Sequence, residues 1–156
     1  MAGVDDLPKL IAMSEAAGAA AHWSGQQWLD VFQTEVPARL ALIAEEKRGE
    51  DVAGAPDGPP VADAGFLVAQ VGNPDWELEN VAVMGEFRRR GMGRELVAAL
   101  LAYARAGDAE RILLEVRASN ESAIRLYEGS GFQLLGRRQG YYRDPAEDAL
   151  VMVHTF

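Results

Sequence analysis

The first feature that could do chemistry is the basic, glycine-containing turn Arg88-Arg89-Arg90-Gly91-Met92-Gly93. It follows a segment of alternating polar and apolar residues and precedes one with helical periodicity, which predicts a strand leading into a helix N-terminus. The first N–H groups of a helix have no partner within the helix, and the helix dipole adds positive potential there. Because glycines also allow a ligand to approach the backbone closely, the turn favours phosphate or pyrophosphate binding.

Several interpretations compete for this turn. A Walker-type P-loop requires Lys-Ser or Lys-Thr after the last glycine, whereas Arg94 and Glu95 follow here. A dinucleotide-binding fingerprint requires a third glycine, where Leu96 stands, and an early place in a βαβ unit. A coenzyme A pyrophosphate loop stays open, as does a glycine-rich turn whose arginines are only solvated surface charge.

Two further residues downstream could move protons. Glu115 lies on the polar face of a predicted strand, 111–117, and a carboxylate near the mouth of a closed site suits a general base. Tyr127 lies on the short predicted helix that follows, and its phenol could donate a proton. On pattern alone, Glu115 could equally be an exposed strand glutamate and Tyr127 a half-buried packing residue.

Together these segments resemble the GNAT superfamily of acetyltransferases. The turn matches its Gln/Arg-x-x-Gly-x-Gly/Ala motif. A second block is similar to the bacterial ribosomal-protein alanine N-acetyltransferases almost residue for residue, through Leu114–Asn120, Ala123, Leu126–Glu128, Gly131-Phe132, Tyr141-Tyr142 and Glu147–Met152. The resemblance is strong from about Trp76 to Met152 and extends weakly to Trp23-Ser24.

This resemblance implies a cosubstrate, acetyl-CoA, and a set of residues that hold it. The strand before the turn would pair with the pantetheine arm, and the turn would hold the pyrophosphate mainly through backbone N–H groups. Asn120 matches a position that contacts CoA, although it could equally be only a helix N-cap. The expected cosubstrate-binding residues are Val81, Ala82, Val83, Arg88, Arg89, Arg90, Gly91, Met92, Gly93 and Asn120.

The resemblance also implies catalytic roles. Glu115 matches the general base and Tyr127 the general acid of the family. Glu77 and Glu79 on the preceding strand are alternative bases, because other branches of the superfamily place one there. The expected substrate-binding residues are Glu79, Tyr141 and Tyr142, of which the two tyrosines would wall a peptide groove.

The implied acceptor is the N-terminal alanine of a small-subunit ribosomal protein. A peptide α-amine has a pKa near 8, so modest base assistance is enough, whereas a lysine amine near 10.4 is harder to ready. Direct transfer in a ternary complex is expected, and the lack of cysteine fits it. A lysine or small-molecule amine is the alternative acceptor, and a non-catalytic acyl-CoA-binding module is a second alternative. His22 and Arg143 replace prolines that are common in the family, and both bear on acceptor identity.

The order of the expected helices and strands, given below, predicts an α+β fold. It would have one mixed, mostly antiparallel sheet flanked by helices and form a single domain over residues 1–156. A flexible loop is expected at 47–62, where Gly, Pro and charged residues gather. The expected helices are 7–21, 25–33 with Ser24 as N-cap, 93–106, and one capped by Ser119 or Asn120 that runs to about Glu128. The expected strands are 36–46, 65–71, 76–83, 111–117, 132–135 and 149–156, with a loop at 136–148.

Composition narrows the function classes. The absence of cysteine excludes disulfides, thiolate zinc sites and a cysteine nucleophile, and no metal is expected because the only histidines are His22 and His154, both read as structural. A net charge of −9 disfavours nucleic-acid binding and suits a basic peptide partner, or only solubility. No apolar run reaches the roughly 18 residues of a membrane span, and no signal-like N-terminus is present, so a cytoplasmic enzyme is expected.

Overall fold

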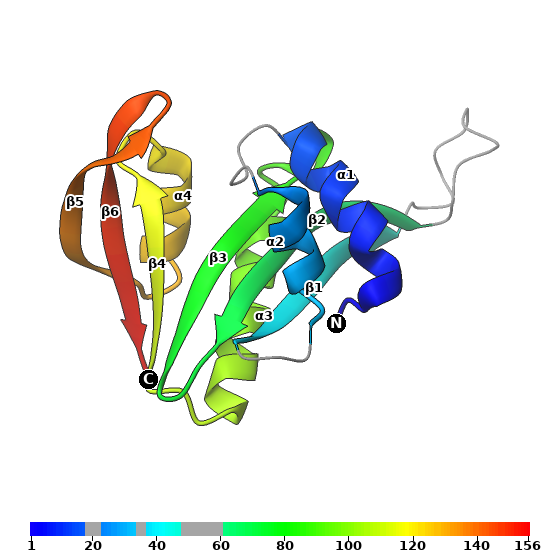
Figure 1. Cartoon of the computed structure of the whole chain (residues 1–156), viewed down its shortest axis with the longest axis horizontal. Coiled ribbons are helices and arrows are strands. Elements are labelled where there is room, and N and C mark those ends of the chain that lie inside the picture. The colour runs from blue at the N-terminus through cyan, green and yellow to red at the C-terminus, as the bar shows by residue number, and fades with distance from the viewer. Residues whose placement is uncertain (18–22, 34–36, 48–60) are drawn as a thin grey trace.

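A computed structural model describes residues 1–17, 23–33, 37–47 and 61–156 and places six strands in one sheet, in the order β1-β2-β3-β4-β6-β5 (Figure 1). The strands are β1 (Ala38–Lys47), β2 (Val61–Val71), β3 (Asp75–Val83), β4 (Arg111–Arg117), β5 (Gln133–Arg143) and β6 (Ala146–Thr155). The α-helices are α1 (Leu7–Ala17), α2 (Gly25–Asp30), α3 (Met92–Ala106) and α4 (Glu121–Glu128), with short 3-10 helices at Val4–Asp6 and Gly85–Phe87.

The sheet is antiparallel except at its centre, where β3 pairs with β4 in parallel. The order of elements is the one that the sequence predicts: two helices, three strands, a helix, a strand, a helix and two strands. The predicted α+β class with a mixed, mostly antiparallel sheet is therefore confirmed. No helix in the described ranges is long and apolar enough to cross a membrane.

Helices cover both faces of the sheet. One core joins the sheet to α3 and α4, and the other joins it to α1 and α2 (Figure 1). In α3, Leu96, Val97 and Leu100 recur at helical spacing and are fully or almost fully buried, each leucine contributing about 1.5–3 kcal/mol by burial. Strand β2 is buried on both sides, since Phe66 belongs to one core and Leu67 to the other.

The N-terminal helices match the prediction in part. The Ser24 hydroxyl accepts from the N–H of Gln27, and the Gln27 side chain accepts from the N–H of Ser24, so the expected N-cap of α2 is a complete capping box. Helix α2 ends at Asp30 rather than Gln33. The predicted continuation of the first helix to Ala21, and His22, lie outside the described residues.

The predicted loop at 47–62 is too long at both ends. Lys47 belongs to β1, Val61 and Ala62 belong to β2, and Lys47 pairs with Val61 in the antiparallel ladder. Ladder hydrogen bonds to a paired strand extend both strands past the point where the sequence becomes polar. Residues 48–60 lie outside the described part of the chain.

The predicted loop at 136–148 is wrong. Strand β5 continues to Arg143 and β6 begins at Ala146, so these residues form most of a long hairpin. Strand β5 is the edge of the sheet and is exposed along nearly its whole length. A strand with no buried face carries no apolar alternation, and for this reason its sequence does not look like a strand.

Candidate active site

A β-bulge in β3 lies where its pairing with β4 ends. The β2–β3 register shifts so that Glu79 has no partner on β2, and the parallel pairing of β3 with β4 ends at Leu78 and Leu114. Beyond that point the two strands diverge toward the end of β3 that leads into α3 (Figure 1). Because a bulge bends its strand and increases the local twist, the bulge at Glu79 accounts for the end of pairing at the adjacent residue.

The divergence leaves backbone groups of β3 facing the opening between β3 and β4. The Met84 N–H donates to the Ala64 carbonyl at 2.9 Å, so Met84 faces β2. Backbone groups alternate along a strand, so those of Ala82 also face β2 while those of Val81 and Val83 face away from it. Of the three predicted pantetheine contacts, Val81 and Val83 therefore present backbone groups on the open side, and Ala82 does not.

The basic turn starts α3 without a side-chain cap. Gly91 is the N-cap residue, with a φ of 93°, and the Glu95 N–H donates to its carbonyl at 3.1 Å. The N–H groups of Met92, Gly93 and Arg94 precede this bond and have no acceptor within the helix. Such groups, at the positive end of the helix dipole, suit an anionic ligand.

The two glycines of the turn are required for different reasons. Gly91 adopts a left-handed conformation, and a Cβ built on it would meet nothing within 4 Å. Gly93 has ordinary dihedral angles, but a Cβ there would lie 3.2 Å from a methyl of Leu126 and 3.7 Å from one of Val83. Gly93 thus lets α3 pack closely against α4 and β3, a role that the motif does not reveal.

The three arginines before Gly91 also differ. Arg88 donates to the carbonyl oxygens of Val83 (3.1 Å) and Ala17 (2.8 Å), which ties the turn to β3 and α1. Arg90 pairs with Glu46 of β1. The side chain of Arg89 is exposed and has no polar partner among the described residues. Arg88 and Arg90 therefore hold the turn in place, and Arg89 is the one whose guanidinium is available for a ligand.

Glu115 lies on the opposite side of the sheet from α3. Its neighbours on β4, Leu114 and Val116, point into the core shared with α3. The Glu115 side chain is 18% exposed, and its Oε1 lies 2.7 Å from a guanidinium nitrogen of Arg138 on β5. The hydroxyl of Tyr141 also donates to this carboxylate, and that hydrogen bond raises the pKa of Tyr141.

Two more carboxylates share this face. Glu79 accepts two hydrogen bonds from Arg39, at 2.7 and 3.0 Å, and both side chains are 18% exposed. Desolvation of its carboxyl raises the pKa of Glu77, and the nearby charges of Glu79 and Glu115 raise it further. The structure thus brings all three glutamates considered as bases to one region, with Glu79 held by a bidentate guanidinium and Glu115 by one guanidinium contact and the Tyr141 hydroxyl.

Tyr127 lies on the other face, within the core around α3 and α4. Its side chain is 5% exposed and packs against Phe132, with ring centroids 5.8 Å apart. Burial raises the pKa of Tyr127 far above its ordinary value, and the proximity of Tyr142 adds to the shift. Glu115 and Tyr127, the two catalytic candidates, thus lie on opposite faces of the sheet. Tyr142 interacts electrostatically with both, because the charge of Glu115 raises the pKa of Tyr142 and Tyr142 contributes to the raised pKa of Tyr127.

Tyr142 is held by the end of β4. The guanidinium of Arg117 lies 4.1 Å from the centre of its ring and donates to the carbonyl oxygens of Asp144 (3.0 Å) and Pro145 (3.2 Å). Sequence reasoning did not assign Arg39, Arg117 or Arg138 to the site. The only available signal was the position of each on a strand face shared with a candidate glutamate or tyrosine, and for Arg138 that signal was hidden by the wrong loop.

Asn120 caps α4. Its Oδ1 accepts from the Ala123 N–H at 3.2 Å and from the Ser122 hydroxyl at 3.1 Å. The N-cap interpretation is confirmed for the side-chain oxygen. A contact with a cosubstrate would therefore have to use the side-chain amide nitrogen.

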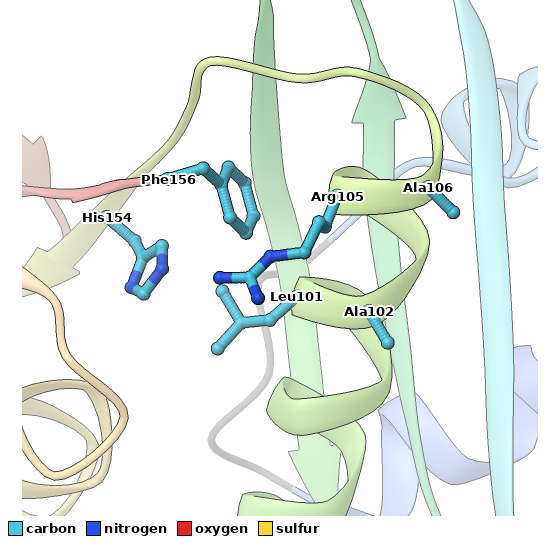
Figure 2. Close-up of a pocket in the computed structure, with 6 residues that line it drawn as sticks. All are labelled: Leu101, Ala102, Arg105, Ala106, His154 and Phe156. Atoms are coloured by element: carbon cyan, nitrogen blue, oxygen red, sulfur yellow. The ribbon is translucent and has the colours of Figure 1, made fainter.

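The pocket in Figure 2 is separate from these candidate residues. It lies at the C-terminal end of α3, whereas the basic turn lies at the N-terminal end of the same helix. It has a volume of about 510 Å³ and is lined by Leu101, Ala102, Arg105, Ala106, His154 and Phe156. The His154 ring packs against Phe132 and Phe156, which agrees with the structural role predicted for it.

Comparison with known proteins identifies the family of this chain and several similar proteins. Residues 14–132 match the model of the acetyltransferase (GNAT) family. The [ribosomal protein bS18]-alanine N-acetyltransferase of Escherichia coli K12 is 40% identical over 91 residues, 57% of this chain and 62% of that protein. The N-alpha-acetyltransferase RimI of Mycobacterium tuberculosis is 40% identical over 78 residues, 50% of this chain and 48% of that protein. Less than two thirds of each relative's length is therefore covered.

A solved structure agrees over a greater length. The ribosomal-protein-S18-alanine N-acetyltransferase from Escherichia coli superposes with a TM-score of 0.71 at 27% identity, covering 99% of this chain and 90% of that one. The similarity in fold therefore extends over nearly the whole chain.

Proposed function

Because this chain belongs to the GNAT family of acetyltransferases, we propose that it transfers the acetyl group of acetyl-CoA to the N-terminal amine of a protein that begins with alanine. A ribosomal protein with a basic N-terminal segment is the proposed acceptor, by analogy with relatives named as bS18-alanine N-acetyltransferases. The observation that carries the proposal is the pair Glu115 and Tyr127 on opposite faces of the sheet, with Glu115 directly after the last residue of β4 that pairs with β3.

The residues around this opening fit acetyl-CoA. The uncapped N–H groups of Met92, Gly93 and Arg94, with the guanidinium of Arg89, would bind the pyrophosphate. The open-side backbone groups of Val81 would pair with the pantetheine arm. When bound, acetyl-CoA supplies an activated acetyl group, and the rest of the chemistry falls to the protein.

Glu115 is the proposed general base. An α-amine with a pKa near 8 is partly neutral at physiological pH, so Glu115 has to remove a proton only as the amine attacks, directly or through one water. The Val83 N–H faces away from β2 and would donate to the developing negative charge on the acetyl oxygen. The Val83 carbonyl already accepts from Arg88, which fixes this part of the backbone.

Tyr127 is the proposed donor to the leaving sulfur. Its raised pKa keeps the phenol protonated, as an acid must be. A thiol has a pKa near 8.5, well below that of this phenol, so complete transfer of the proton to the sulfur is uphill. Tyr127 therefore acts first as a hydrogen-bond donor that stabilises the developing thiolate.

The acceptor would lie on the face of the sheet that carries Glu115. Tyr141, which is 46% exposed, and Tyr142 would wall the peptide groove, and Glu79 would lie at its floor beside Arg39. With no cysteine to carry an acetyl group, transfer is proposed to be direct within a ternary complex. The net charge of −9 would favour a basic acceptor.

Thiol release from acetyl-CoA tests the proposal. A basic peptide that begins with alanine should release thiol, and the same peptide with a blocked α-amine and an internal lysine should not. Equal release from both peptides would move the acceptor to lysine, and release only with small amines would establish the alternative acceptor class. No release with any amine would favour an acyl-CoA-binding module.

Replacement of the proposed base gives the first mutational prediction. Glu115→Gln should lower kcat by about 10²–10⁴-fold while leaving CoA binding intact, because the amide cannot accept the proton. Glu79→Gln is the matched control, with a smaller loss expected because its carboxylate is held by Arg39. Steady-state kinetics and calorimetry with CoA measure both effects. An unchanged rate for Glu115→Gln would transfer the role of base to Glu79.

A further inference from the structure

Two guanidinium–carboxylate pairs lie on the proposed acceptor face. Arg39 binds Glu79 with two hydrogen bonds, and Arg138 contacts Glu115 at 2.7 Å. Both carboxylates are mostly shielded from water, with 18% of each side chain exposed. The structure thus balances these two negative charges before any acceptor arrives.

A second bulge brings Tyr141 to Glu115, beside Arg138. The β5–β6 register shifts between Arg138 and Tyr142, so three residues of β5 stand opposite one of β6. Gly140, with a φ of 59°, lies inside this bulge, and its N–H donates to Asp148 at 2.9 Å. In a regular strand Arg138 and Tyr141 would point to opposite faces, because they are three residues apart. The bulge puts both side chains on the same carboxylate, that of Glu115.

The charge of Glu115 matters to the acceptor as well as to the proton transfer. A carboxylate within about 4–6 Å of an amine stabilises the ammonium form and raises the pKa of the amine. The ammonium form has no lone pair and cannot attack. A base that is not charge-balanced would therefore bind its substrate tightly in the unreactive state.

We propose that Arg138 is a positioning residue of the acceptor site, which orients Glu115 and balances its charge so that the acceptor amine binds in its neutral, nucleophilic form. This inference rests on the proposed function, and in particular on Glu115 as the base. The Arg138 side chain is 58% exposed whereas that of Glu115 is 18% exposed, so a largely solvated guanidinium balances a carboxylate that is mostly shielded from water.

Other charged and titratable groups on this face set the background. They are Asp30 beyond Arg39, Glu77 and Glu79 on β3, Arg117 on β4, and Tyr141, Tyr142 and Glu147 around the hairpin. Glu77 has no guanidinium of its own among these contacts, and the Arg138 charge acts on its pKa in the opposite direction to the charges of Glu79 and Glu115. Loss of Arg138 would therefore leave two neighbouring carboxylates less compensated.

The test is Arg138→Gln, compared with Arg137→Gln as the matched control. Arg137 is the adjacent residue, is equally exposed at 57%, and pairs instead with Asp148. For Arg138→Gln, kcat at pH 7 should fall about fivefold, the acid limb of the kcat–pH profile should move up by about one pH unit, and kcat near pH 9.5 should approach that of the wild type. The acceptor KM should fall or stay constant, because the ammonium form binds more tightly.

Two further variants separate positioning from structural support. Arg138→Lys keeps the charge and should recover most of the wild-type rate at pH 7. In a Glu115→Gln background, Arg138→Gln should cause no additional loss of kcat, because the residue acts through Glu115. A pH-independent loss of rate with a raised acceptor KM, a failed lysine rescue, or an additive double mutant would each overturn the proposal.

A measurement without turnover gives independent evidence. With CoA in place of acetyl-CoA, acceptor binding at pH 7 should release about half a proton in the wild type and clearly less in Arg138→Gln, as measured by calorimetry in two buffers. Equal proton release would overturn the proposal. The acceptor in these experiments is whichever amine the wild type acetylates best, so a lysine or small amine would refute the proposed substrate while the Arg138 test proceeds unchanged.

Discussion

At the scale of single residues, the site combines a shielded carboxylate with a deeply buried phenol. Glu115 is held by Arg138 and Tyr141 at the acceptor face. The pKa of Tyr127, in contrast, is raised mainly by desolvation, with a smaller contribution from Tyr142. Burial penalises the phenolate, so Tyr127 stays neutral over the whole range in which the enzyme would work. The same burial links this residue to stability at high pH.

At alkaline pH, ionisation of the Tyr127 phenol should lower the free energy of unfolding. Its pKa is raised on folding, so its contribution to stability is complete below the unfolded value of 10.0 and is lost as the pH rises above it. From pH 8 to pH 11 the free energy of unfolding should fall by about 1 kcal/mol less in Tyr127→Phe than in the wild type. Urea unfolding measures this difference. Tyr103→Phe, at a residue that is 40% exposed, should behave as the wild type does, and equal losses in all three proteins would refute the prediction.

At the scale of elements, two bulges and one turn shape the site. The bulge at Glu79 ends the pairing of β3 with β4, and the bulge after Arg138 directs the Tyr141 side chain to Glu115. The turn before α3 depends on a left-handed Gly91 that has open space around it. Each device is a local departure from regular structure, and each lies where a ligand is proposed to bind.

Gly91→Ala should therefore weaken CoA binding as well as stability. An alanine in the left-handed region costs about 1–2 kcal/mol, and relief of that strain would displace the uncapped N–H groups of α3. Urea unfolding and calorimetry with CoA measure the two effects. Gly85→Ala, where a Cβ meets nothing within 4 Å and φ is not positive, should change stability by less than about 0.5 kcal/mol. The same result for both variants would show that the left-handed turn is not needed.

At the scale of the whole molecule, charge is unevenly distributed. The net charge is −9, yet the turn before α3 carries Arg88, Arg89 and Arg90, and Arg94 follows in the first turn of that helix. The acidic balance suits a basic acceptor, while the local basic turn suits the anionic cosubstrate.

Salt should therefore weaken the reaction with a basic acceptor. Between about 0.05 M and about 0.5 M salt, kcat/KM for a basic Ala-initiated peptide should fall several-fold, because the Debye length shortens from more than 10 Å to less than 5 Å. A peptide with the same first residue and neutral residues after it should change much less, with acetyl-CoA saturating in both assays. Equal salt dependence would show that the acidic surface plays no part in acceptor recruitment.

The sequence by itself determined the order of the elements and the residue types that could do chemistry. Helical spacing identified α3, and alternation identified β3 and β4. Each of these elements has one buried face, so its apolar residues recur in the sequence with the period of a helix or a strand. The Arg88–Gly93 turn was found by its glycines and its place between a strand and a helix, whereas Glu115 and Tyr127 were assigned catalytic roles through the resemblance to the GNAT superfamily.

Tertiary structure alone decided how these residues meet. The edge strand β5 has almost no buried face, so its extent, its bulge and the contact of Arg138 with Glu115 were invisible in the sequence. Likewise, only the packing shows that Gly93 serves the approach of α3 to α4. Periodicity records which side of an element is buried, but register and pairing between distant segments depend on contacts that no local pattern records.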